Sequence, residues 1–236
     1  MVDYSITEFD IPCQGLTKLP DDIDKYTNLK RINCTNNKIT NLDNLPPKLP
    51  VLYCAFNRLT SLDNLPPTLK ILHCSYNEIT SLDNLPPTLE VLDCSDNEIT
   101  SLDNLPPTLE ILDCSNNEIT SLDNLPPTLK ELGCTNNQIT SLDNLSPNLE
   151  TLDCRYNQIT SLDNIPPNLI KLYCQSNKLT SLDNLPNGQL AGHEDKPLGF
   201  PLKLEVLYCY DNPLKYDFKP LLENIRFFNT IKKLSS

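Results

Sequence analysis

The chain has 236 residues, with 21 prolines, 5 glycines, 10 cysteines and no tryptophan, and its 31 acidic against 19 basic residues give a net charge of −12. Such acidity disfavours phosphate backbones and anionic lipid surfaces, so we expect neither nucleic-acid nor membrane binding. No run approaches the roughly 18 apolar residues of a membrane-spanning helix. Residues 1–8 lack the basic and apolar regions of a secretory signal, so we expect a soluble intracellular protein.

A repeat of 20 residues runs through most of the chain. The unit from Leu89 to Thr108 reads LEVLDCSDNEITSLDNLPPT, and we number its positions as places 1 to 20. Leucine recurs at place 1 in nine units, at Leu29, Leu49, Leu69, Leu89, Leu109, Leu129, Leu149, Leu169 and Leu204. A divergent first unit fits the same register from Ile6. A fixed period this short predicts a solenoid of ten coils, which we number 1 to 10 along the chain.

Each coil is predicted to contain one short strand and no α-helix. Apolar places 1, 4 and 6 alternate with places 3, 5 and 7, as in a β-strand with one buried face. Asparagine at place 9 can end the strand, because its amide can bond backbone groups in the turn. Paired prolines such as Pro86 and Pro87 remove backbone donors and favour extended or polyproline geometry. We therefore expect a strand, a turn and an extended return.

Three regions follow from this register. Residues 1–28 are predicted to form an N-terminal cap and the first, divergent repeat. Residues 29–212 hold the remaining repeats, interrupted at 187–203 by a glycine-rich insertion that should bulge as a loop, either idle or a contact finger. Residues 213–236 show helical spacing of apolar residues after Pro220, which predicts a C-terminal capping helix.

The repeat resembles that of the leucine-rich repeat family, whose pattern is L-x-x-L-x-L-x-x-N/C-x-L. Coil 5 carries it at Leu89, Leu92, Cys94, Asn97 and Ile99, and the resemblance covers roughly residues 6–212. The 20-residue period and the LPPxL link are similar to the short subclass of secreted bacterial effectors and to repeat proteins of large DNA viruses. The resemblance implies a leucine-rich repeat solenoid, with a parallel β-sheet on one face and extended returns on the other. Cysteine at place 6 and the LDNLPP stretch depart from the family pattern.

Nine of the ten cysteines occupy place 6, and only Cys13, at place 8, does not: Cys34, Cys54, Cys74, Cys94, Cys114, Cys134, Cys154, Cys174 and Cys209. There is no C-x-x-C pair, and a spacing of 20 is no zinc signature. His73 adjoins Cys74 but should point to the opposite face, which disfavours a catalytic pair. We predict a buried column of free thiols, because parallel Cβ vectors oppose disulfide geometry, and such a column suits a reducing compartment.

Aspartate forms a second column at place 15, at Asp43, Asp63, Asp83, Asp103, Asp123, Asp143, Asp163 and Asp183. One hypothesis is that these stacked carboxylates recruit calcium. The other, which we favour, is that each accepts local N–H groups in an Asx-type turn, joined by the hydroxyls at places 12 and 13.

Variation between coils concentrates at places 2, 3, 5, 7, 8 and 10, mostly on the strand face that points away from the core. The early coils carry aromatic residues there, the middle coils are acidic and the late coils return to tyrosine. The candidate partner-binding residues are Tyr53, Phe56, His73, Tyr76, Asp93, Asp96, Asp113, Asp153, Tyr156, Tyr173 and Tyr208. Exposed aromatics beside charge are typical of interface hot spots. The alternative is that these residues drift between copies without a role.

The sequence predicts a non-catalytic, monomeric protein-interaction scaffold. It contains no P-loop, G-x-S-x-G or H-E-x-x-H motif and only two histidines, so we expect no enzyme, metal or cofactor. The expected partner is a protein or peptide, and the acidic middle would suit a basic one. A structural or cation-dependent spacer is the alternative. A less favoured one, implied by the resemblance, is an effector fragment that acts as the recognition half of a ubiquitin ligase, in a host cytosol.

Overall fold

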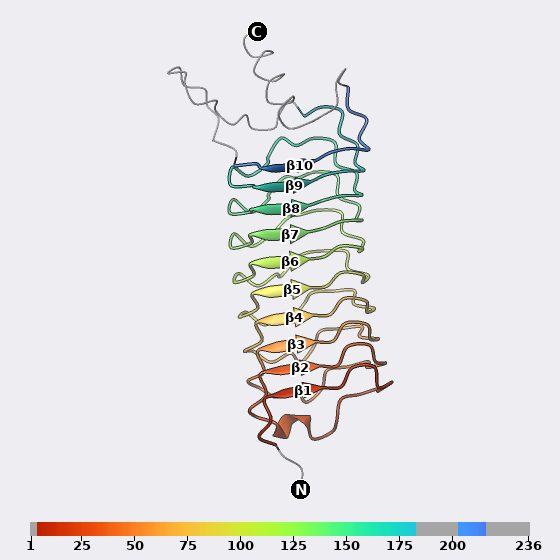
Figure 1. The fold of residues 1–236 in the computed structure, drawn as a ribbon, viewed down its shortest axis with the longest axis vertical. Coiled ribbons are helices and arrows are strands. Elements are labelled where there is room, and N and C mark those ends of the chain that lie inside the picture. Colours follow the sequence, from red (N-terminus) through yellow and green to blue (C-terminus); the bar gives the residue numbers. More distant parts are fainter. Residues whose placement is uncertain (1–3, 183–202, 216–236) are drawn as a thin grey trace.

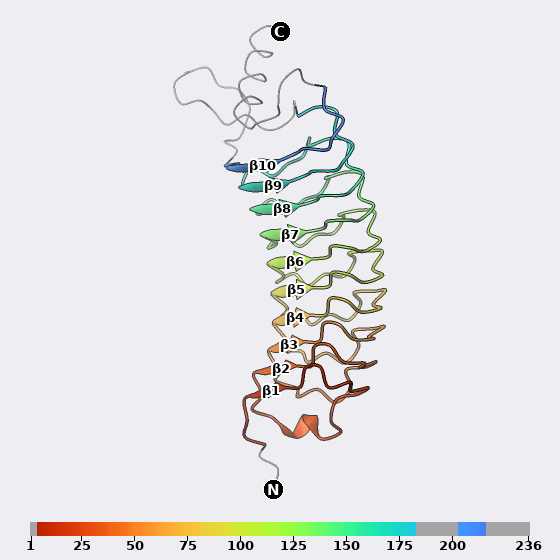
Figure 2. The ribbon, with the colours of Figure 1, turned by 45° about the vertical axis from the view of Figure 1, so that its right-hand side comes forward.

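The computed structural model describes residues 4–182 and 203–215, which form a curved solenoid (Figures 1 and 2). The described residues contain ten strands of three residues each, one per coil. They are β1 (Glu8–Asp10), β2 (Arg31–Asn33), β3 (Val51–Tyr53), β4 (Ile71–His73), β5 (Val91–Asp93), β6 (Ile111–Asp113), β7 (Glu131–Gly133), β8 (Thr151–Asp153), β9 (Lys171–Tyr173) and β10 (Val206–Tyr208). All ten belong to one parallel sheet, in the order of the sequence.

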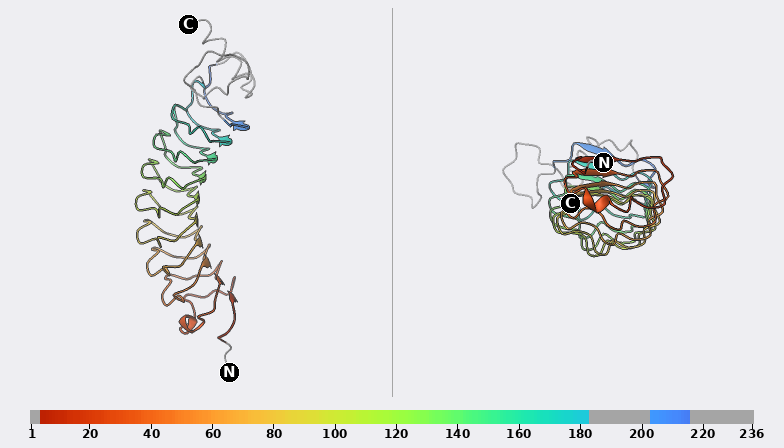
Figure 3. Two further views of the ribbon diagram at one scale, coloured as in Figure 1. Left: turned by 90° about the vertical axis from the view of Figure 1, so that its left-hand side faces the viewer. Right: turned by 90° about the horizontal axis from the view of Figure 1, so that it is seen from below.

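Each strand pairs with the next one place for place. Leu72 on β4 lies opposite Leu92 on β5, and Phe9 on β1 lies opposite Ile32 on β2. The divergent first coil therefore has the predicted register. Figure 3 shows the strands lining the inner side of the arc, so the strand face is concave and the returns are on the outside. The predicted leucine-rich repeat architecture is confirmed.

The core is a continuous column of the side chains at places 1, 4, 6, 11 and 14. In coil 5 the residues at the first four of these places, from Leu89 to Ile99, are fully buried, and Leu102 at the fifth is 2% exposed. The same places are buried in coils 2 to 9, because side chains at equivalent places point the same way when coils stack in register. Burial of this column, which no single coil could achieve, holds the stack together.

The asparagine at place 9 binds two coils at once. The Nδ2 of Asn137 donates to the carbonyl of Cys134 in its own coil, at 3.2 Å, and to that of Cys114 in the preceding coil, at 3.0 Å. Its Oδ1 accepts the N–H of Ile119 at 2.9 Å. Asn212 makes the same contacts in coil 10. The predicted role in the turn is confirmed, and it extends to linking adjacent coils.

The returns of coils 2 to 8 contain turns and extended backbone and no helix, as the paired prolines predict. Asparagine at place 16 adopts positive φ in coils 2 to 7, for example 64° at Asn124, a conformation that asparagine tolerates better than most residues. The first return differs and carries a 3-10 turn, η1 (Ile23–Lys25). There Ile23 is fully buried and Tyr26 packs edge-on against Phe9, with ring centroids 5.4 Å apart.

Two predicted features lie outside the described residues. They are the body of the insertion at 187–203 and the apolar pattern of the capping helix within 213–236. In the part of the chain that the structure describes, there is no helix of the length and apolar character needed to cross a bilayer.

Candidate functional site

The place-6 cysteines form a buried column behind the sheet. Their side chains are fully buried from Cys34 to Cys174, and Cys209 is 3% exposed. Burial raises the pKa of Cys34 to about 12 and that of Cys209 to about 11. Some thiols donate to the next coil, as Cys114 Sγ does to the Gly133 carbonyl at 3.3 Å. Neutral, enclosed thiols are poor nucleophiles, so this column belongs to the core.

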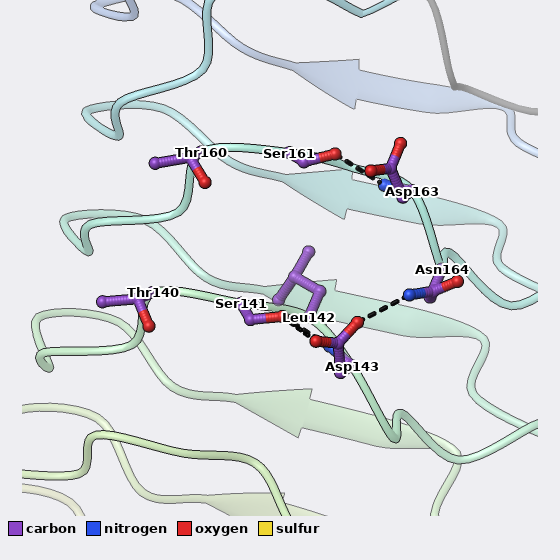
Figure 4. A pocket seen from close by; sticks show the side chains of 8 residues that line it. All are labelled: Thr140, Ser141, Leu142, Asp143, Thr160, Ser161, Asp163 and Asn164. Atoms are coloured by element: carbon purple, nitrogen blue, oxygen red, sulfur yellow. Dashed lines mark hydrogen bonds between the residues drawn. The ribbon is translucent and has the colours of Figure 1, made fainter.

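The exposed place-15 aspartates from Asp43 to Asp143 are each hydrogen-bonded by the following coil. The Nδ2 of the place-16 asparagine donates to the preceding coil's aspartate at distances from 3.2 Å, at Asn64 and Asp43, to 2.6 Å, at Asn164 and Asp143. Ser141 also donates to Asp143 at 2.6 Å (Figure 4). These bonds from Ser141 and Asn164 lower the pKa of Asp143. The favoured turn hypothesis is wrong about the main donors, which are amides of the next coil rather than local N–H groups. Its predicted contribution from hydroxyls is confirmed at Ser61, Ser121 and Ser141.

A small hollow lies between the returns of coils 7 and 8, where these hydrogen-bonded side chains meet (Figure 4). Its lining comprises Thr140, Ser141, Leu142, Asp143, Thr160, Ser161, Asp163 and Asn164. Its volume of about 140 Å³ is well below the roughly 300–1,000 Å³ of ligand pockets. The hollow is therefore a surface feature of the Asn–Asp ladder, the row of hydrogen bonds from place-16 asparagines to the aspartates of the preceding coils.

Calcium is not expected to stabilise the chain. The carboxylates from Asp43 to Asp143 already accept amide hydrogens, some of them hydroxyl hydrogens as well, and the described residues contain no group of three or more potential metal ligands. Millimolar CaCl2 should shift the melting temperature by less than about 1 °C relative to NaCl of equal ionic strength. A calcium-specific rise of several degrees would instead support the cation-dependent spacer.

An early aromatic cluster lies on the concave face at coils 3 and 4. The rings of Phe56 and Tyr76 are stacked, with centroids 4.1 Å apart and planes 9° apart. The ring centroids of Tyr53 on β3 and His73 on β4 lie 4.9 Å apart. Phe56 and Tyr76 are 47% and 49% exposed, so they present apolar surface to solvent. The structure thus brings together the four early candidate residues.

The backbone at place 8 is left-handed in every coil. Its φ is between 53° and 58° at Cys13, Asn36, Phe56, Tyr76, Asp96, Asn116, Asn136, Tyr156, Ser176 and Asp211. Asparagine and aspartate suit this conformation, whereas bulky aromatic residues there are uncommon and add strain on the order of 1 kcal/mol. This constraint was not predicted from the sequence, although the recurrence of asparagine and aspartate at place 8 is a signal of it. Aromatic residues at place 8 are therefore disfavoured by the fold itself.

The acidic middle consists of Asp93, Asp96 and Asp113. Asp93 accepts the Ser95 hydroxyl at 2.7 Å, Asp96 accepts the Asn116 amide at 3.2 Å, and Asp113 accepts a backbone N–H at 3.0 Å. None of the three forms an ion pair among residues 4–182 and 203–215. These half-buried carboxylates thus stand together without a neutralising cation.

Asp153 differs from these three aspartates because Arg155 binds it. Arg155 donates to both of its carboxylate oxygens, at 2.7 and 2.6 Å. This pairing, which the sequence analysis missed, removes Asp153 from the unpaired acidic group. The Arg155 guanidinium carbon also lies 6.0 Å from the Tyr173 ring centroid.

A late aromatic cluster covers coils 8 to 10. The rings of Tyr173 and Tyr208 are parallel within 7°, with centroids 5.5 Å apart. Tyr156 is 57% exposed, and Tyr210, which was not among the candidates, is 56% exposed. Gln175 is buried here, and its Oε1 is the one buried side-chain polar atom in the described residues without a hydrogen-bond partner. Tyr156, Tyr208 and Tyr210 are thus exposed and Tyr173 is half-buried, and all four lie in coils other than those of Asp93, Asp96 and Asp113.

Comparison with known proteins supports this architecture. A family model described as leucine-rich repeats, two copies, matches residues 67–107, 87–127, 107–147 and 127–167. YopM from Yersinia enterocolitica superimposes with a TM-score of 0.75 and 35% sequence identity, over 88% of this chain and 43% of that one. The chain thus spans less than half the length of YopM. No curated protein sequence matches it.

Two further solved structures share the fold. The leucine-rich repeat domain of a Shigella effector aligns with a TM-score of 0.58 and 29% identity, over 88% of this chain and 76% of that domain. A domain of InlJ from Listeria monocytogenes, described as including a cysteine ladder, aligns with a TM-score of 0.59 and 28% identity, over 92% of this chain and 56% of that one. With ten in-register strands and a 20-residue period, the chain belongs to the leucine-rich repeat family, and its short repeats resemble those of bacterial effectors.

Proposed function

We propose that the chain is a non-catalytic protein-interaction module that binds a basic protein segment on its concave face. Leucine-rich repeat proteins typically mediate protein–protein interactions and are generally not enzymes. The observation that carries the proposal is the group of unpaired carboxylates, Asp93, Asp96 and Asp113, on the face where the coils differ. A basic segment would supply the charge that the chain itself does not.

The distribution of variation supports a recognition role for this face. The return side is nearly invariant, because its Asn–Asp ladder and buried leucines hold the stack together. The concave side is free to vary. Random drift at place 8 should favour residues that tolerate positive φ, yet Phe56, Tyr76 and Tyr156 stand there. Retention of strained, exposed rings is what selection for a contact would produce.

The cysteines support a further proposal, that the chain works in a reducing compartment. Nine neighbouring coils place buried cysteines behind the sheet, and none of the ten cysteines forms a disulfide. A core built on reduced thiols is suited to the cytosol, including that of a host cell.

Charge reversal on the concave face tests the proposed function. The variant with Asp93→Lys and Asp113→Lys should lose capture of a stoichiometric partner from cytosolic lysate, because like charges would then oppose a basic segment. The matched control carries Glu150→Lys and Glu205→Lys, which change the net charge equally at exposed positions outside the acidic middle. Capture should persist in this control. Equal capture by wild type and both variants would contradict the proposal.

A further inference from the structure

Aromatic rings and unpaired carboxylates meet where coil 4 adjoins coil 5. Four residues form this surface, His73 and Tyr76 of coil 4 and Asp93 and Asp96 of coil 5. We propose that they bind an arginine side chain of the partner in preference to a lysine, and we call them the arginine site. The inference rests on the proposed function and specifies which basic side chain the concave face recognises.

The four residues form two adjacent pairs. His73 and Asp93 lie directly opposite each other on β4 and β5. Tyr76 and Asp96 both occupy place 8, with φ of 54° and 53°, so their side chains leave the backbone in matching directions from neighbouring coils. At each of the two places, a ring in coil 4 is followed by a carboxylate in coil 5.

Tyr76 has one ring face left for a ligand. Its other face is stacked on Phe56 of coil 3, 4.1 Å away and within 9° of parallel. Because coils 3, 4 and 5 succeed one another along the solenoid, the free face is directed toward the coil that carries Asp96. Tyr76 is 49% exposed, so a partner can reach this face from solvent.

Lys70 is the single lysine or arginine of coils 4 to 6, and it is bound to another acid. It pairs with Glu90 at 2.6 Å. In the described part of the chain, Asp93 and Asp96 therefore have only hydrogen bonds from uncharged groups. A cation brought by the partner would find two carboxylates beside an aromatic face.

A guanidinium fits this arrangement better than an ammonium. It is planar, so it can lie over a ring while its N–H groups bond a carboxylate in a bidentate fork. The chain itself offers an example of this combination. Arg155 bonds both oxygens of Asp153 and lies 6.0 Å from the Tyr173 ring centroid. The arginine site presents the same two groups, a carboxylate and a tyrosine ring, without a resident arginine.

The test compares two labelled peptides of equal length and charge, one of about six Gly-Arg repeats and one of about six Gly-Lys repeats. Fluorescence anisotropy at physiological ionic strength should show that wild type binds the arginine peptide about fivefold more tightly. Tyr76→Asn should remove this preference. Asparagine occupies the same place in coils 6 and 7, as Asn116 and Asn136, so the variant should fold.

Tyr156→Asn is the matched control. Tyr156 shares the place, the left-handed backbone and the exposure of Tyr76, but the adjacent coils carry Asn136 and Ser176 at place 8 instead of a carboxylate. This variant should keep the preference for arginine. Asp96→Asn, which suits the same backbone and removes only the charge, should lose it and provides a second route should Tyr76→Asn fold poorly.

The possible outcomes separate the inference from the proposed function. Equal binding of the two peptides by wild type, or a preference that survives both Tyr76→Asn and Asp96→Asn, would overturn the arginine site alone. Binding of both peptides that the Asp93→Lys and Asp113→Lys variant abolishes would still support a basic partner. Binding of neither peptide by wild type would count against both.

Discussion

Raising the pH above about 9 is expected to unfold the solenoid over a narrow interval. The cause is a column of eight fully buried thiols, those of Cys34, Cys54, Cys74, Cys94, Cys114, Cys134, Cys154 and Cys174. Burial raises their pKa values, to about 12 for Cys34, whereas the same thiols ionise near 8.5 in an unfolded chain. The neutral form is thus favoured in the folded state. Stability from this source is complete below about pH 8.5 and is lost as the pH rises toward the folded pKa.

The expected slope is steep because the thiols act together. Each thiol that ionises only on unfolding lowers the unfolding free energy by about 1.4 kcal/mol per pH unit, and eight give about 11 kcal/mol. A total stability on the order of 5–15 kcal/mol would be lost within one or two units. Circular dichroism followed against pH, in enough salt to screen the net negative charge, measures the transition.

Replacing thiols should flatten this transition. A variant with Cys94→Ala, Cys114→Ala and Cys134→Ala has three fewer ionising groups, so its slope should fall by about 4 kcal/mol per pH unit. Its stability at neutral pH will also fall through the cavities created, and for that reason the slope is the quantity to compare. Cys13→Ser, at an exposed cysteine, should leave the slope unchanged. A wild-type chain that remains folded at pH 11 would contradict the expectation.

The core was predictable because the repeat determines which side chains of each coil point to the buried side of the strand. Once Leu89, Leu92 and Cys94 are assigned to the buried side of a strand, every coil with the same spacing must bury its equivalents, and the structure shows that it does. The absence of helix in the returns of coils 2 to 8 follows as directly from paired prolines such as Pro86 and Pro87, because neither can donate a helical hydrogen bond. Local chemistry and the 20-residue period determine both features.

Contacts between side chains of different coils were less predictable. The donor to Asp143 is Asn164, 21 positions along the chain, and its identification needs the offset between stacked coils. The pairing of Arg155 with Asp153 depends on a rotamer, since Arg155 could equally extend into solvent. The φ of 54° at Tyr76 could not be predicted from its residue type, because an aromatic residue does not usually indicate a left-handed backbone. The contacts on the concave face therefore could not be predicted from the sequence alone, whereas the core could.

Replacing Asn137 by aspartate is expected to lower the unfolding free energy by about 3–5 kcal/mol. The side chain is 8% exposed, and its Nδ2 donates to the carbonyls of Cys114 and Cys134. A carboxylate has the same shape and can still accept the N–H of Ile119, but it would direct negative charge at two carbonyl oxygens. Coils 6 and 7 would then repel each other at the point where the asparagine joins them, and urea unfolding measures the loss.

The neighbouring residue supplies the matched control. Asn136 is exposed at place 8, where coil 5 has Asp96 and coil 10 has Asp211, so Asn136→Asp should change stability by less than about 1 kcal/mol. Acidification should recover part of the stability of the Asn137→Asp variant, because a buried carboxylic acid has a raised pKa and can donate one hydrogen bond once protonated. Equal losses in the two variants would mean that the amide of Asn137 does not hold adjacent coils together. A loss confined to Asn137→Asp would show that each repeat is joined to the next through one buried side chain as well as through its strand.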